Sequence, residues 1–131
     1  MILAAVKQGS FVITLHQGFG RVVLFYSVLV AIWGIFLYFR GSNPSGGYLG
    51  ALVINEGVVI LQGILGVVLL LLGNRPHDGL HFLYGVVAVV TLPSAYLYSS
   101  RGSERRDSLI FGLAALFLFG IGIRAFTTGQ G

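Results

Sequence analysis

The chain has 131 residues, of which 56% are hydrophobic and 9% are charged, and its formal net charge is +4. Soluble domains carry about 25% charged residues, so this chain has too few charges to cover a water-facing surface, and most of it must face lipid. The basic residues flank apolar runs, as is usual in membrane proteins, which argues against nucleic acid as a partner. The chain has no cysteine, which excludes disulfides and thiolate metal sites.

The first apolar stretch, residues 1–14, is interrupted by Gln8, Gly9 and Ser10. It is too short to cross a bilayer, which takes about 20 residues, so we interpret Met1–Val6 as frayed or as lying along the membrane interface. Four longer apolar runs follow. We expect membrane spans at about residues 16–39, 48–72, 79–98 and 108–126.

The connections between these spans are short. Residues 40–47 and 73–76 are rich in Gly, Ser, Asn and Pro, which is typical of turns. Pro93 lies inside the third span and is tolerated if Thr91 and Ser94 satisfy the freed backbone groups. Arg101–Asp107 mixes both charges, and we interpret it as a solvated loop that contacts lipid phosphate.

The two halves of the chain begin alike. Residues 15–20 read Leu-His-Gln-Gly-Phe-Gly and residues 80–85 read Leu-His-Phe-Leu-Tyr-Gly, so each half places a His one helical turn before a Gly. We therefore predict two repeats, residues 15–73 and 80–126, each with two spans. Because each repeat has an even number of spans, both repeats point the same way. His16 and His81 should then lie on the same side of the membrane at similar depth.

The predicted fold is an all-α integral membrane protein with one domain, residues 1–131, folded as an up-down bundle of four transmembrane helices. We expect a multi-pass protein of a bacterial-type cytoplasmic membrane. The positive-inside rule places both termini outside by a margin of one residue. The cations on the terminal side are Lys7, Arg75 and Arg124, and those on the opposite side are Arg40, Arg101, Arg105 and Arg106.

Two histidines at equal depth on inward faces could hold haem b through both axial positions, since neutral imidazole is a common haem ligand and helix bundles bind cofactors between facing helices. Gly20 and Gly85 would leave room for a flat porphyrin. Arg21, or Arg75 or Arg124 on the same side, could pair with the propionates. This pattern favours an electron-transfer subunit with bis-His haem.

Other interpretations remain open. A His near the end of a span is often only an interfacial polar residue, and the chain could be an accessory or assembly subunit of a larger membrane complex without any cofactor. His77 and His81 have the i, i+4 spacing of zinc ligands, but His77 is not followed by the Glu of the His-Glu-x-x-His pattern. We find no nucleophile elbow, phosphate loop or Rossmann fingerprint, so the sequence argues against an enzyme.

Glu56 is the one acidic residue inside an expected span, and Gln62 is a second polar interruption of the same span. An ionisable group at such depth is a functional-site hypothesis by default. Glu56 could relay a proton in a minimal transporter, or bind a cation or the hydroxyl of a quinone. Alternatively, it could lie at the interface or reach toward Arg105 or Arg106.

Overall fold

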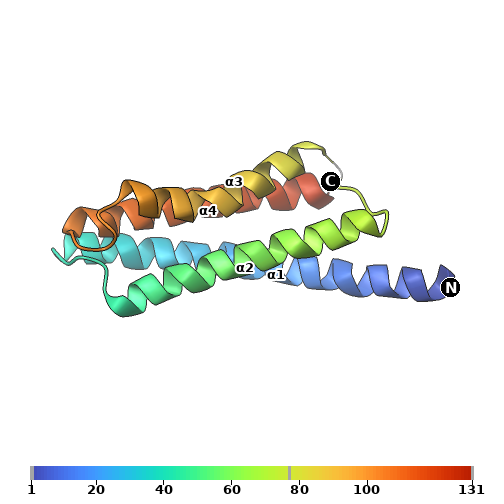
Figure 1. Cartoon of the computed structure of the whole chain (residues 1–131), viewed down its shortest axis with the longest axis horizontal. Helices are drawn as coiled ribbons and strands as arrows, with labels where there is room; N and C mark the ends of the chain where they lie inside the picture. The colour runs from blue at the N-terminus through green and yellow to red at the C-terminus, as the bar shows by residue number, and fades with distance from the viewer. Residues whose placement is uncertain (1, 77, 131) are drawn as a thin grey trace.

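The computed structural model describes residues 2–76 and 78–130, with side chains for residues 9–76 and 78–129. Met1, His77 and the Lys7 side chain, which entered the interpretations above, lie outside these residues. The described part is all-helical, with one helix for each expected span (Figure 1). The helices are α1 (Ile2–Phe39), α2 (Gly46–Leu71), α3 (Leu80–Tyr98) and α4 (Arg105–Gln130).

Each helix contains a stretch that is long and apolar enough to cross a membrane. The apolar side chains that remain exposed, such as Phe25 at 70% and Leu71 at 81%, lie on the outside of the molecule. In water this surface would be unfavourable because burial of apolar area is a main driving force of folding. In a bilayer the same surface would contact apolar lipid chains, and its exposure would not be unfavourable.

Helix α1 begins at Ile2, well before the expected start near residue 16, and Gln8, Gly9 and Ser10 do not interrupt it. A single Gly inside a helix costs only about 1 kcal/mol, which neighbouring contacts can offset. Gly9 is itself buried, and a Cβ built on it would lie 3.5 Å from Asn74 Nδ2 in the α2–α3 connection. The N-terminal part of α1 is therefore packed against another segment.

The helix ends follow the turn residues of the sequence. Gly41 and Gly73 have φ angles of +81° and +91°, the left-handed conformation in which Gly commonly ends a helix. At the end of α2, the Gly73 and Asn74 amides donate to the carbonyls of Leu70 and Leu69. Ser45 caps α2 by accepting a hydrogen bond from the Tyr48 amide at 3.1 Å.

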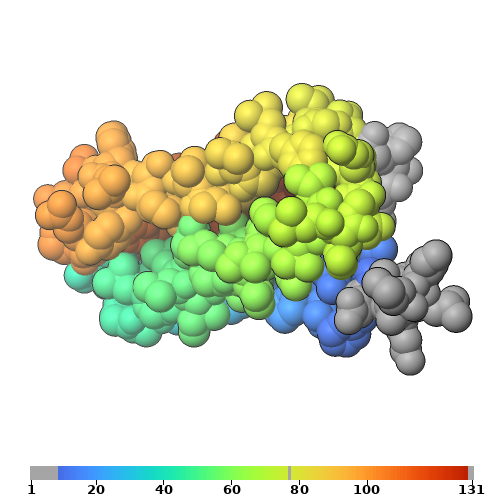
Figure 2. Space-filling view, turned by 45° about the vertical axis from the view of Figure 1, so that its right-hand side comes forward, coloured from blue at the N-terminus to red at the C-terminus, as the bar shows by residue number. Residues whose placement is uncertain are grey.

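Successive helices run in opposite directions, and the two termini lie at the same end of the molecule (Figure 1). Helix α1 packs extensively against α4 and also against α2, whereas α3 packs mainly against α4 and contacts between α2 and α3 are sparse. Parts of α4 are visible between α2 and α3 in the space-filling view (Figure 2). The side of the bundle between α2 and α3 is therefore its least closely packed side.

The core lies between α1, α2 and α4, and Leu92 of α3 also belongs to it. Gly34 and Gly112 let the backbones of α1 and α4 approach closely, since a Cβ built on Gly34 would lie 2.8 Å from Gly112 Cα. Small residues allow such contacts in membranes, where no hydrophobic effect drives helices together. The buried apolar side chains of this cluster are Val23, Val30, Ala31, Tyr48, Leu52, Val59, Leu92, Phe111, Ala115 and Leu118.

Pro93 does not interrupt α3, which is continuous from Leu80 to Tyr98. The Thr91 hydroxyl donates to the carbonyl of Val87 at 2.6 Å. That residue lies two positions before Val89, whose carbonyl has no helical donor because Pro93 lacks an N–H. Thr91 therefore bonds within the helix but to a different carbonyl from the one that the sequence led us to expect.

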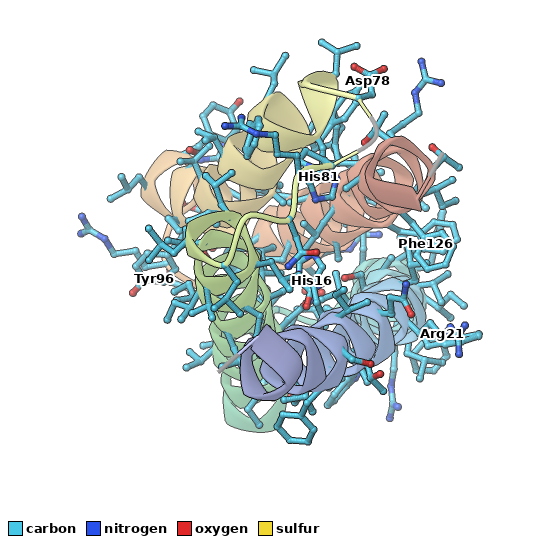
Figure 3. The ribbon with its side chains drawn as sticks, turned by 90° about the vertical axis from the view of Figure 1, so that its right-hand side faces the viewer. His16, Arg21, Asp78, His81, Tyr96 and Phe126 are labelled. Atoms are coloured by element: carbon cyan, nitrogen blue, oxygen red, sulfur yellow. The ribbon has the colours of Figure 1, made fainter. Side chains whose placement is uncertain are left out.

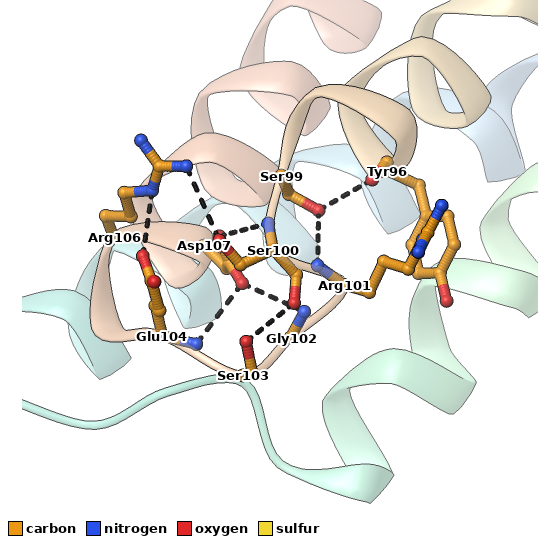
Figure 4. Close-up of polar contacts among 9 residues, drawn as sticks. All are labelled: Tyr96, Ser99, Ser100, Arg101, Gly102, Ser103, Glu104, Arg106 and Asp107. Carbon is orange, nitrogen blue, oxygen red and sulfur yellow. Dashed lines mark hydrogen bonds and ion pairs between the residues drawn. The ribbon is translucent and has the colours of Figure 1, made fainter.

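The α3–α4 connection is organised by a buried carboxylate. Asp107 is completely buried and accepts hydrogen bonds from the amides of Ser100, Gly102 and Glu104 at 3.0, 2.9 and 3.3 Å (Figure 4). The expectation of a solvated loop is therefore wrong for Asp107. An acidic residue in the first turn of a helix satisfies free amides and interacts favourably with the helix dipole.

Candidate functional site

His16 and His81 meet in the centre of the bundle at the end that carries the termini (Figure 3). Their ring centroids are 6.1 Å apart, and the ring planes cross at 73°. His16 comes from the middle of α1 and His81 from the first turn of α3. The structure thus brings together the two histidines that occupy corresponding places in the two halves of the sequence.

The hydrogen bond of the His81 ring to a backbone carbonyl decides which ring nitrogen carries the proton. Its Nδ1 lies 2.7 Å from the carbonyl oxygen of Ala125 in α4, and because a carbonyl can only accept, Nδ1 must donate. A neutral imidazole then has its lone pair on Nε2. A backbone carbonyl that holds the far ring nitrogen in this way is the usual second partner of a metal-ligating His.

His16 is held differently. Gln62 Nε2 of α2 donates to the backbone carbonyl of His16 at 2.6 Å, which fixes α2 against α1 at this level. The ring nitrogen Nδ1 of His16 is buried and has no hydrogen-bond partner among the described residues. A buried polar atom without a partner is unfavourable, so this imidazole is a candidate for an interaction with a group other than the chain itself.

Two glycines on the other two helices border the imidazoles. A Cβ built on Gly129 of α4 would lie 2.9 Å from His81 Cε1, and one built on Gly66 of α2 would lie 3.4 Å from His16 Cε1. Any side chain at Gly129 would have to displace the His81 ring. Each imidazole therefore lies close to a glycine of a neighbouring helix. Only at Gly129 does the position of the ring require that there is no side chain, because a Cβ on Gly66 would be in ordinary van der Waals contact with His16.

The glycines proposed from the sequence lie elsewhere. A Cβ built on Gly20 would be 3.1 Å from Gln62 Nε2, whereas one built on Gly85 would meet no atom of the described residues within 4 Å. Gly85 is exposed, and Arg21 is exposed on the outside of α1 (Figure 3). Neither Gly85 nor Arg21 borders the imidazole pair in the way that Gly66 and Gly129 do.

Sequence reasoning missed Gly66 and Gly129. For Gly66 a signal existed, because Asn55, Val59 and Gln62 precede it at the spacing of one helix face, and Asn55 and Val59 are buried in the structure. Gly129 lies in the polar segment at the end of the chain, where no periodicity distinguishes it.

The donor set at this site consists of the two imidazoles. No group of three or more His, Cys, Asp or Glu side chains that could hold a metal ion occurs within the described residues, which do not include His77. A structural zinc ion takes four protein ligands. Two imidazoles match in number the axial ligands that a haem iron takes when its four other ligands come from the porphyrin.

The spacing of the rings agrees with that donor set. A metal held by one nitrogen of each ring at about 2.0–2.1 Å separates those nitrogens by about 4 Å, and the ring centroids by about 6 Å. The observed centroid distance is 6.1 Å. The spacing and the buried unpartnered Nδ1 of His16 are therefore compatible with a single metal atom between the two rings.

Glu56 and Asn55 form a second polar feature, nearer the middle of α2. Both carboxyl oxygens of Glu56 and Nδ2 of Asn55 are buried without a hydrogen-bond partner among the described residues. The alternative in which Glu56 reaches Arg105 or Arg106 does not occur. Arg105 donates to the carbonyl of Tyr38 at 2.7 Å and lies over its ring, and Arg106 pairs with Glu104 at 3.0 Å.

Comparisons with protein-family models, with curated proteins and with solved structures found no match to this chain.

Proposed function

We propose that this protein is a haem b-binding electron-transfer protein in which His16 and His81 are the two axial ligands. The observation that carries the proposal is the meeting of the two imidazoles, one from α1 and one from α3, at a centroid distance of 6.1 Å. A bound haem would supply one-electron redox chemistry.

The residues of the chain would position the ligands. The Ala125 carbonyl oxygen, 2.7 Å from Nδ1 of His81, holds the proton on that nitrogen and so leaves the Nε2 lone pair free to bind a metal. The hydrogen bond from Gln62 to the His16 carbonyl at 2.6 Å sets the height of His16 relative to α2. Gly66 and Gly129 keep side chains away from both rings.

We further propose that the four helices cross a bacterial-type cytoplasmic membrane as an up-down bundle of two parallel two-helix repeats, with both termini outside. The end with Arg40, Arg101, Arg105 and Arg106 would then face the cytoplasm, as the positive-inside rule favours. Because the chain has no cysteine, single cysteines at Ser103 and Thr127 can be tested with a membrane-impermeant maleimide in intact cells. We expect labelling of the cysteine at position 127. Labelling of the cysteine at position 103 instead would show that the orientation is the opposite of the proposed one.

An absorption spectrum tests the haem proposal. The protein is expressed with haem supplementation, purified in mild detergent, and measured before and after reduction with dithionite. We expect a reducible b-type band that is lost in His16→Ala and in His81→Ala and retained in His77→Ala, which changes the same residue type. Circular dichroism of each variant shows whether its helices are intact.

A colourless wild-type protein, or a band that survives both His16→Ala and His81→Ala, would refute the haem proposal. An accessory subunit without a cofactor would instead co-purify with partner subunits, and neither substitution would affect that association. A band lost in His81→Ala but retained in His16→Ala would show that His16 is not an axial ligand and would refute the proposed pair.

A further inference from the structure

The unpartnered atoms of Asn55 and Glu56 offer complementary hydrogen-bonding groups. Ser27 Oγ donates to Asn55 Oδ1 at 3.3 Å, so the amide oxygen faces α1 and Nδ2 points away from it. Nδ2 is a donor without an acceptor, and the Glu56 carboxylate is an acceptor without a donor, within the described residues. Asn55 and Glu56 are consecutive residues, so their side chains leave α2 about 100° apart.

Glu56 lies on the side of α2 that faces α3. Gly63 lies two turns after Glu56 on the same face of α2, and a Cβ built on Gly63 would lie 4.0 Å from the side chain of Val89 in α3. Glu56 therefore faces the α2–α3 seam, which is the sparsely packed side of the bundle. The space-filling view shows that α2 and α3 do not close completely over α4 (Figure 2).

A ligand for this seam must satisfy three conditions. It must reach the middle of a lipid-facing helix, so it must dissolve in the bilayer. It must accept a hydrogen bond from an amide and, in one of its states, donate one to a carboxylate. It must also tolerate apolar surroundings. A quinone head group meets all three, because its ring is flat and apolar and carries two oxygens that are carbonyls when oxidised and hydroxyls when reduced.

We infer that the α2–α3 seam binds the head group of a lipid-soluble quinone, with Asn55 Nδ2 donating to one ring oxygen and the Glu56 carboxylate accepting from the other when it is a hydroxyl. The assignment of this quinone as the electron partner of the imidazole site rests on the proposed function. Glu56 lies ten residues before Gly66, about 15 Å along the helix axis, so α2 connects the two sites.

The chain contains one tryptophan, which makes the binding test specific. Trp33 packs edge-to-face on Tyr48 with ring centroids 5.1 Å apart, and Tyr48 lies two turns before Asn55 on the inward face of α2. Quinones quench indole fluorescence at close approach. The haem-free full-length protein in nanodiscs is titrated with decylubiquinone and, separately, with its reduced form, and Trp33 fluorescence is followed.

We expect saturable quenching by both forms. Asn55→Leu should weaken binding of both forms about tenfold, the effect of losing one hydrogen bond to a buried group. Glu56→Leu should weaken the reduced form more than the oxidised form, since only the hydroxyl donates. Glu104→Leu, which removes an exposed carboxylate, should leave both affinities unchanged. Quenching that is linear and equal in all four proteins would be collisional and would overturn the inference.

A second measurement needs no variant. Dicyclohexylcarbodiimide reacts with carboxyl groups in apolar surroundings, and mass spectrometry locates the adduct. Saturating decylubiquinone should slow labelling of Glu56 at least fivefold without changing any labelling of Glu104. An unchanged rate at Glu56 would overturn the inference. Both measurements use haem-free protein. A negative result for quinone binding therefore does not affect the haem proposal, and a missing haem band does not affect the test of quinone binding.

Discussion

The contact between α1 and α4 leads to a quantitative prediction for Gly34→Ala. A Cβ at position 34 would lie 2.8 Å from Gly112 Cα and 2.9 Å from the Ser108 carbonyl oxygen, and it would also collide with the Tyr48 hydroxyl. Two of these three groups are backbone atoms of α4, so a side-chain rotation cannot relieve the contact. The helices must separate, and the core between them must loosen.

The magnitude follows from comparison with Gly120→Ala. A Cβ on Gly120 would meet no described atom within 4 Å, so this variant gains only the helix propensity of Ala over Gly, about 1 kcal/mol. Gly34→Ala has the same gain but also the cost of overpacking, typically about 1–3 kcal/mol. Because fixed backbone is involved, we expect the upper end, and the two variants should differ by about 3 kcal/mol.

Reversible unfolding in mixed micelles of increasing SDS content, followed by circular dichroism and Trp33 fluorescence, measures this difference. Gly34→Ala should unfold at lower SDS than the wild type, and Gly120→Ala at equal or higher SDS. If Gly34→Ala were as stable as Gly120→Ala, the close approach of α1 and α4 described here would be wrong.

Three further predictions concern single side chains. Asp107→Asn loses acceptor capacity for three backbone amides, so we expect its free energy of unfolding to fall by about 1–3 kcal/mol and trypsin to cleave the α3–α4 connection faster. The control Glu104→Gln should cost less than about 1 kcal/mol. Equal cleavage of the two variants would contradict this prediction. Tyr48→Phe removes a buried hydroxyl that donates to a backbone carbonyl at 3.1 Å, so its SDS midpoint should fall by the equivalent of about 1 kcal/mol; an unchanged midpoint would mean that this bond does not contribute. Gly129→Val displaces the His81 ring and should lower the haem-to-protein ratio, whereas Gly85→Val at an exposed position should not. Equal ratios in the two variants would mean that Gly129 does not contribute to haem binding.

The positions of the helices were largely predictable because hydropathy and turn chemistry are local properties. An apolar run of membrane length bounded by Gly, Asn and Pro specifies where a helix ends, and Gly41 and Gly73 indeed adopt positive φ. The prediction failed at the beginning of α1, where Gly9 is buried beside Asn74. That contact comes from a connection more than sixty residues away, which a local pattern cannot reveal.

The candidate site was predictable only in part. The sequence by itself determined the composition that requires lipid, the four apolar helices, and the two histidines at matching places in the halves of the chain. Only the tertiary structure decided that Gly66 and Gly129 adjoin the imidazoles and that Ala125 fixes a ring proton. Periodicity defines the faces of a single helix, but the partner of each face depends on how α2 and α4 pack against α1 and α3, and this packing is set by contacts between distant residues.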